Sequence, residues 1–160
     1  MTQTLTEQAI LPAVRAWTRL LRASASTTRL LSADLQEAHS LTINDFEALL
    51  VLSHAEDGRL KRVDLARNLM LTPSGITRLL RGLEDAGLVE RAACASDLRV
   101  TYAQLTGAGR EKLEAASSAH IASIRALFEQ HFTAEELDTV AGILGKLPGV
   151  TDGDDSCSPG

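Results

Sequence analysis

Residues 72–87, TPSGITRLLRGLEDAG, constrain the fold most strongly because they carry the signals for both ends of one helix. Thr72 can cap the first turn by accepting a backbone N–H, and Pro73 suits the first helical position, where no N–H is needed. Gly87 suits the left-handed position that ends a helix. An inward stripe at helical spacing is formed by Ile76, Leu79, Leu80 and Leu83. The stretch therefore predicts one short amphipathic helix.

The opposite face of this helix is small, hydroxylic and basic. It carries Ser74, Gly75, Thr77, Arg78 and Arg81. Such a face fits the major groove of DNA, where small residues permit close approach and Arg can donate two hydrogen bonds to guanine. An ordinary amphipathic helix with a solvated face fits the same pattern, so the neighbouring segments have to decide.

The neighbouring segments predict a winged helix-turn-helix. A short helix over 62–70 precedes through a tight turn, and its inward residues are expected to be Val63, Ala66 and Leu69 or Met70. After Gly87, strands are predicted at 88–93 and 100–105, and Leu60 can start a very short strand. The loop between the two longer strands, residues 94–99, would be the wing.

Long helical patterns flank this core. A helix over 42–56 belongs to the winged domain itself, and Thr42, Thr106 and Thr133 stand at N-cap positions. The flanking patterns cover residues 9–38, 107–131 and 133–147. These helices are more than a winged domain needs, so their apolar stripes must bury against something. A second copy of the chain is the simplest partner, because DNA sites are commonly read by two-fold dimers.

We therefore expect a mainly α chain with a small β-hairpin wing, in which a winged helix-turn-helix is flanked by long N- and C-terminal dimerisation helices. The expected division is an N-terminal dimerisation helix (1–38), a winged helix-turn-helix lobe that binds DNA (39–105), C-terminal dimerisation helices (106–148) and a disordered acidic tail (149–160).

The charge is unevenly distributed along the chain. The formal net charge is −5, but the segment from Arg59 to Arg110 holds nine basic and five acidic residues and carries +4. The remainder carries −9. Because an electrostatic footprint is judged on the domain that meets the phosphates, the basic middle is compatible with nucleic-acid binding.

Composition and motifs argue against several other classes. No apolar run approaches the roughly 20 residues that cross a bilayer, and no signal peptide opens the chain, so we expect a cytoplasmic protein that does not bind membranes. The two cysteines, Cys94 and Cys157, form no CxxC pattern, and the four histidines lack ligand spacing, so no metal site is expected. No catalytic motif or cofactor motif is present, so an enzyme is not expected. A redox role for either cysteine stays open.

The ordered pieces LTINDFEALLVL, RVDLARNLMLTPSGITRLLRGLEDAGLVER, SDLR, LTGAGREKL and FTAEELDTVAGILGKL resemble the MarR family of bacterial transcription regulators. The resemblance runs from about Leu41 to Leu147. It implies a homodimer that binds double-stranded DNA at a pseudo-palindromic operator. It also implies a repressor that a small aromatic or anionic effector releases from the DNA.

The resemblance also assigns residues. Ser74, Gly75, Thr77 and Arg78 correspond to the DNA-facing part of the family's recognition helix, and Thr72 and Arg81 of the same stretch are further candidate DNA-binding residues. Asp97 and Arg99 match the wing pair, in which the Asp orients an Arg that enters the minor groove, where negative potential is concentrated. No effector-binding residue can be carried over, although Trp17 and the histidines could line such a pocket.

This chain departs from the family pattern at two places. Leu98 stands between Asp97 and Arg99, where many members carry a second basic residue. Gly82 occupies a place where Arg is frequent, and whether Arg81 replaces that contact stays open. A winged-helix adaptor that binds a protein partner and no DNA is the alternative function.

Overall fold

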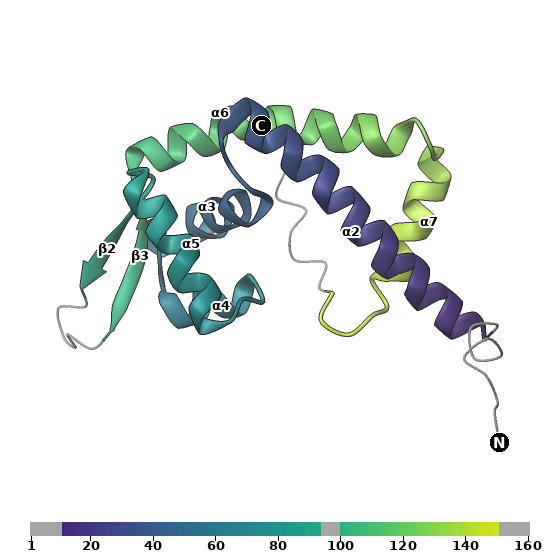
Figure 1. Ribbon diagram of the computed structural model, residues 1–160, viewed down its shortest axis with the longest axis horizontal. Coiled ribbons are helices and arrows are strands. Elements are labelled where there is room, and N and C mark those ends of the chain that lie inside the picture. The colour runs from purple at the N-terminus through teal and green to yellow at the C-terminus, as the bar shows by residue number, and fades with distance from the viewer. Residues whose placement is uncertain (1–10, 94–99, 151–160) are drawn as a thin grey trace, which may run out of the picture.

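The computed structural model describes residues 11–93 and 100–150 and has a winged lobe at one end and long helices extending from it (Figure 1). The elements in chain order are α2 (Pro12–His39), α3 (Ile43–His54), η1 (Glu56–Gly58), β1 (Arg59–Lys61), α4 (Arg62–Asn68), α5 (Pro73–Asp85), β2 (Val89–Ala93), β3 (Thr101–Leu105), α6 (Gly107–Glu129) and α7 (Ala134–Leu144). The expected fold class, mainly helical with a small antiparallel sheet in a winged helix-turn-helix, is confirmed.

Threonine side chains cap the N-termini of four helices. The Thr72 hydroxyl accepts from the Gly75 N–H at 3.1 Å, and the Thr106 hydroxyl accepts from the Gly109 N–H at 3.0 Å. Thr42 and Thr133 each form a reciprocal capping box with the acidic side chain three residues later. The N-caps predicted from the sequence are therefore confirmed, and they fix where α3, α5, α6 and α7 start.

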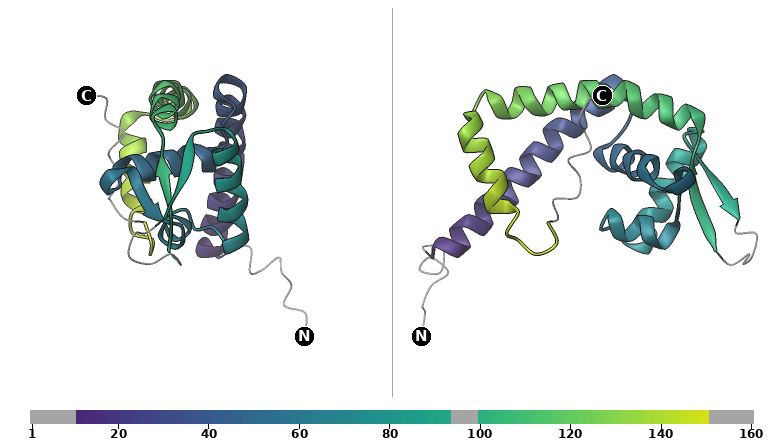
Figure 2. Two further views of the ribbon diagram at one scale, coloured as in Figure 1. Left: turned by 90° about the vertical axis from the view of Figure 1, so that its left-hand side faces the viewer. Right: turned by 180° about the vertical axis from the view of Figure 1, so that it is seen from behind.

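The helix α2 is continuous over its whole length. Pro12 occupies the first turn, where its missing N–H costs nothing, and the stretch 23–28, which is poor in large apolar residues, stays helical. There the Thr27 hydroxyl donates to the Ala23 carbonyl at 2.9 Å. The helix ends at His39, and the C-cap residue Ser40 has a left-handed φ of 55°. Its C-terminal part packs beside α6, whereas its N-terminal half extends away from the winged lobe (Figure 2).

The wing strands belong to a three-stranded antiparallel sheet of order β1-β3-β2. Leu60 of β1 and Arg91 of β2 both lie opposite Ala103 of β3. The chain enters β1 through two consecutive left-handed residues, Asp57 (φ 55°) and Gly58 (φ 66°), which end the preceding helical segment. The sheet therefore ties the wing to the segment just before the helix-turn-helix.

The hydrophobic core lies inside the winged lobe and extends onto α2 and the first half of α6. Its largest fully buried side chains are Leu35, Leu49, Leu52, Leu65 and Leu80. They come from α2, α3, α4 and α5, so the core holds the two helices of the helix-turn-helix against the long helices.

The inward face predicted for α4 was confirmed at Ala66 and Leu69 and was wrong at Val63 and Met70. Val63 is 69% exposed and Met70 is 91% exposed, whereas Leu65 is fully buried. The helix ends at Asn68, and Met70 takes a left-handed φ of 51° that turns it toward solvent. The inward residues are Leu65, Ala66 and Leu69, a stripe rotated from the expected one, because contacts with α3 and α5 set the orientation of a helix this short.

No helix in the part of the chain described by the structure is both long enough and apolar enough to cross a membrane.

Candidate DNA-binding surface

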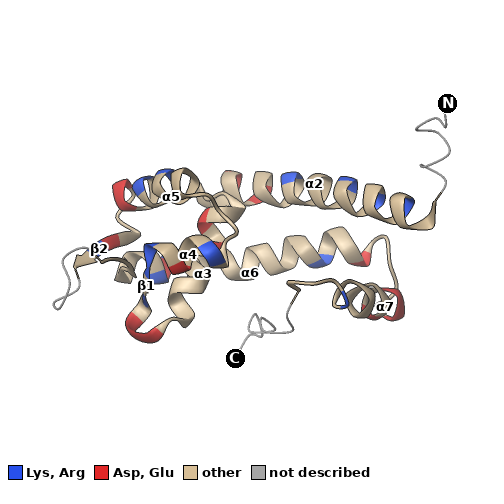
Figure 3. Cartoon of the chain, turned by 90° about the horizontal axis from the view of Figure 1, so that it is seen from below, with Lys and Arg blue, Asp and Glu red and all other residues tan. Residues whose placement is uncertain are grey.

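The exposed face of α5 carries a stripe of polar and basic side chains. Ser74, Thr77, Arg78 and Arg81 are three, four and seven residues apart, so they share one side of the helix, and all four are exposed. The opposite side buries Ile76, Leu80 and Leu83 in the core. Basic positions lie along α5 in the view from below (Figure 3). The core therefore fixes which side of this helix faces outward.

Both ends of α5 are held by specific contacts. At the start, the hydroxyls of Thr72 and Ser74 lie 3.2 Å apart. At the end, Gly87 has φ 71°, its N–H donates to the Glu84 carbonyl, and the Leu88 N–H donates to the Leu83 carbonyl. These two bonds make a Schellman motif, as the predicted role of Gly87 requires.

Gly75 packs against the turn that precedes α5. A Cβ atom at this position would lie 3.2 Å from the Thr72 hydroxyl and 3.6 Å from the Leu71 Cβ atom. The small size of Gly75 thus has a structural reason, independent of any contact with DNA. Thr72 likewise serves the fold, because its hydroxyl caps the helix.

Ion pairs neutralise part of the basic middle of the chain. Arg67 pairs with Asp64 at 3.0 Å, and Arg91 pairs with Glu84 at 2.9 Å. The hydrogen bond and the negative charge of Glu84 raise the pKa of Arg91. These pairs lie at the surface, where each is worth little to stability.

Three arginines on or beside α5 have no such partner. Arg62, Arg78 and Arg81 form no ion pair with a carboxylate in residues 11–93 and 100–150. Their charge is therefore available to an anionic partner on the exposed side of α5.

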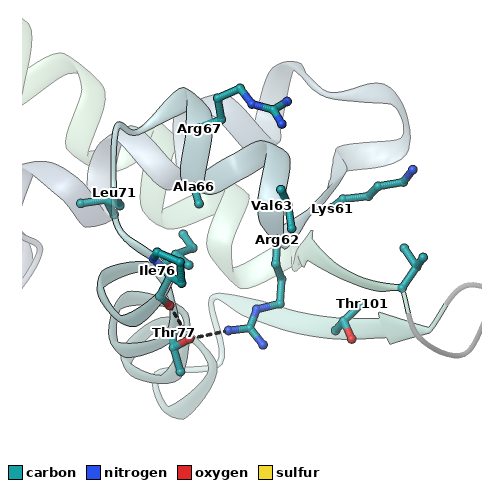
Figure 4. Close-up of a pocket in the computed structure, with 11 residues that line it drawn as sticks. Lys61, Arg62, Val63, Ala66, Arg67, Leu71, Ile76, Thr77 and Thr101 are labelled. Atoms are coloured by element: carbon teal, nitrogen blue, oxygen red, sulfur yellow. Dashed lines mark hydrogen bonds between the residues drawn. The ribbon is translucent and has the colours of Figure 1, made fainter.

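Arg62 links α4 to α5. Its Nη2 donates to the Thr77 hydroxyl at 2.8 Å across a groove of about 630 Å³ (Figure 4). Further lining residues include Lys61, Val63, Arg67 and Leu71. This contact could not be predicted from the sequence, because the two residues are 15 positions apart and no local pattern connects them.

The predicted wing residues Asp97 and Arg99 lie outside the described residues, as do Cys94 and Cys157. The expected wing contact with the minor groove therefore stays a prediction, and so does the question of a redox role for either cysteine.

A second cavity, of about 350 Å³, lies between α2 and α6. His39 and His120 line it together with Asp34 and Glu37. The His120 ring lies 4.8 Å from the Phe46 ring between centroids, and no described group makes a hydrogen bond with its Nδ1. Burial lowers the pKa of His120, and the charge of Asp34 partly opposes this.

The other aromatic candidates for an effector pocket do not line this cavity. Trp17 is 61% exposed, and His54 and His131 are also exposed. No cluster of potential metal ligands occurs within the described ranges.

The chain is similar in sequence and fold to known transcription regulators. Residues 41–101 match the sequence model of the MarR family. The transcriptional repressor YetL from Bacillus subtilis is 35% identical over 107 residues, a match that covers 67% of this chain and 64% of YetL. The chain thus spans less than two thirds of that relative's length.

Solved structures are similar over nearly the whole chain. AbsC, a MarR family transcriptional regulator from Streptomyces coelicolor, is 34% identical, with a TM-score of 0.73 over 90% of this chain and 93% of AbsC. Sco3205, a MarR family regulator from the same organism solved in complex with DNA, is 26% identical, with a TM-score of 0.75 over 88% of each chain.

Proposed function

Because the chain belongs to the MarR family, we propose that it is a DNA-binding transcriptional regulator, a dimeric repressor that leaves a pseudo-palindromic operator when a small effector binds. The observation that carries the proposal is the exposed stripe of α5, in which Arg78 and Arg81 have no described carboxylate partner. In a major groove, each arginine could donate two hydrogen bonds to a guanine.

The test is a gel shift with the duplex upstream of the protein's own gene and with duplexes selected from a random pool. We expect binding to half-sites about one helical turn apart, and affinity that falls steeply with salt because bound cations are released from the DNA. Arg78→Ala should weaken binding about 10- to 100-fold. Arg125→Ala, which removes a surface charge from α6, is the matched control and should change affinity little.

The wing gives a second test of the same function. Arg99→Ala should weaken binding with little loss of thermal stability, because the family resemblance assigns Arg99 to the minor groove. Unchanged affinity would remove the wing from the mechanism. If no duplex shows a salt-sensitive shift, the DNA-binding proposal fails and the adaptor alternative is favoured.

Exposed apolar side chains support the proposed dimer. Trp17 of α2 is 61% exposed and Ile143 of α7 is 57% exposed, and both lie on segments remote from the winged lobe (Figure 1). Large apolar side chains at such exposure commonly mark an interaction surface. Sedimentation of the purified chain should give twice the monomer mass.

The two cavities differ in the effector that they suit. The groove between α4 and α5 combines the basic Arg62 and Arg67 with the apolar Val63 and Leu71, a lining that suits an aromatic acid. The acidic Asp34 and Glu37 disfavour an anion in the α2–α6 cavity. A screen of aromatic acids for thermal stabilisation and for release of bound DNA tests this part of the proposal.

A further inference from the structure

The Thr77 hydroxyl lies on the proposed reading face of α5, but two hydrogen bonds already engage it. It donates to the Pro73 carbonyl at 2.7 Å and accepts from Arg62 Nη2 at 2.8 Å. A hydroxyl has one proton to donate and two lone pairs that accept. While these bonds persist, Thr77 cannot donate a hydrogen bond to a base.

With its proton and one lone pair engaged, the Thr77 hydroxyl keeps a single acceptor site, and the methyl group is the other group that Thr77 can offer to DNA. Thr77 is exposed on the same side of α5 as Arg78. In the major groove, the apolar group that a threonine methyl can meet is the 5-methyl group of thymine. The arrangement thus excludes a hydrogen bond donated by Thr77 and leaves its methyl group available for an apolar contact.

Arg62 is held where it can maintain this orientation. Its side chain lies along the groove wall with its Nη2 directed at Thr77 (Figure 4). Its Nε is buried and has no hydrogen-bond partner among the described atoms, so the bond to Thr77 is the side-chain hydrogen bond that this guanidinium makes in the described structure. No carboxylate in the described residues competes for its guanidinium. Arg62 is thus the one side chain outside α5 to which the Thr77 hydroxyl is bonded in the described structure.

We propose that Arg62 is a positioning residue that acts through Thr77: it keeps the hydroxyl turned toward α4, so that the methyl group faces the DNA and each half-site carries a thymine that meets it. The inference rests on the proposed function. It assigns sequence specificity to Thr77, and it gives Arg62, in the first helix of the helix-turn-helix, the role of orienting Thr77.

The experiment replaces each thymine of a selected duplex, one at a time, by deoxyuridine, which lacks only the methyl group. Binding is measured by fluorescence anisotropy. The unmodified protein should lose about fourfold in affinity at one position per half-site, the effect of one buried methyl-sized group. Thr77→Ser should bind both duplexes equally, whereas Thr77→Val should keep the difference because it retains methyl groups without a hydroxyl.

The role of Arg62 is tested by Arg62→Met, which keeps the length of the side chain but loses its donors. This change should reduce the thymine preference, and the double variant Arg62→Met/Thr77→Val should restore it, because valine presents a methyl group without being positioned. Arg67→Met is the matched control on α4, since Arg67 pairs with Asp64 and should leave the preference unchanged. Thermal melts establish that each variant is folded.

Two results would overturn the inference while leaving the proposed function intact. One is equal affinity of the unmodified protein for thymine and deoxyuridine at every position. The other is an undiminished thymine preference in the folded Arg62→Met variant. Failure to bind any duplex would instead refute the proposed function, and the inference with it.

Discussion

Gly109→Ala should destabilise the fold at the point where the start of α6 packs against the segment that follows α5. A Cβ atom on Gly109 would lie 2.1 Å from the Leu88 carbonyl oxygen and 2.7 Å from a methyl carbon of Leu105. An ordinary carbon–oxygen contact is about 3.3 Å, so the backbone must separate by roughly 1 Å. The same carbonyl accepts the Thr106 N–H at 3.1 Å, and this bond would be stretched.

The expected cost follows from these contacts. Overpacking of this kind costs about 1–3 kcal/mol, and a lost hydrogen bond adds about 1 kcal/mol. The higher helix propensity of alanine offsets up to about 1 kcal/mol of this cost. We expect Gly109→Ala to lower the free energy of unfolding by about 2 kcal/mol, which for a chain of this size lowers Tm by roughly 4–8 °C.

The assay is thermal and urea unfolding followed by circular dichroism, at one protein concentration because the stability of the proposed dimer would depend on concentration. Gly107→Ala is the matched control, since it lies in the same helical turn and has no atom within 4 Å of its added Cβ. It should change stability by less than about 0.5 kcal/mol. The reasoning is refuted if the Gly109 variant is as stable as the control.

Three further outcomes are expected. Gly82→Ala should raise the free energy of unfolding by about 0.5–1 kcal/mol, because Gly82 is exposed within α5 and an added Cβ meets nothing within 4 Å; an unchanged melt would contradict this. Thr42→Ala should lower it by about 1 kcal/mol through loss of the capping box, whereas no loss would mean that solvent replaces the cap. Burial lowers the pKa of His120, so the folded state favours the neutral ring and stability should fall as the pH drops below about 6.5. His120→Gln should weaken this dependence in urea unfolding at pH 7 and pH 5; an identical dependence would exclude His120 as its source.

The parts of the fold that local sequence determines could be predicted. Thr42, Thr72, Thr106 and Thr133 each cap a helix through an N–H within the first turn, so the sequence pattern and the contact span the same few residues. The end of α5 is determined equally locally, by the left-handed backbone of Gly87. The exposed stripe of α5 follows from the buried one, since helical periodicity fixes one face once the other is known.

The features that were missed depend on contacts between distant segments. The pairing of Leu60 with Ala103 joins residues more than forty positions apart, and the orientation of α4 around Leu65 depends on what packs against it. The Arg62–Thr77 hydrogen bond belongs to the same class. Such contacts leave no periodic trace in the sequence, so a candidate site can be assigned to a helix face before its supporting residues are known.

The attachment of α6 has a mechanical consequence. The Thr106 N–H donates to the Leu88 carbonyl at 3.1 Å, and its hydroxyl donates to the Gly87 carbonyl at 2.7 Å, so the start of α6 is fastened to the end of α5. The 23 residues of α6 make an arm of about 35 Å. If an arm of this length tilts by about 5° about one end, its other end moves by roughly 3 Å. This distance is about a quarter of the width of the major groove. In the proposed complex with DNA, a small rotation about the far end of α6 would therefore displace α5 by a distance on the scale at which a helix enters or misses the major groove.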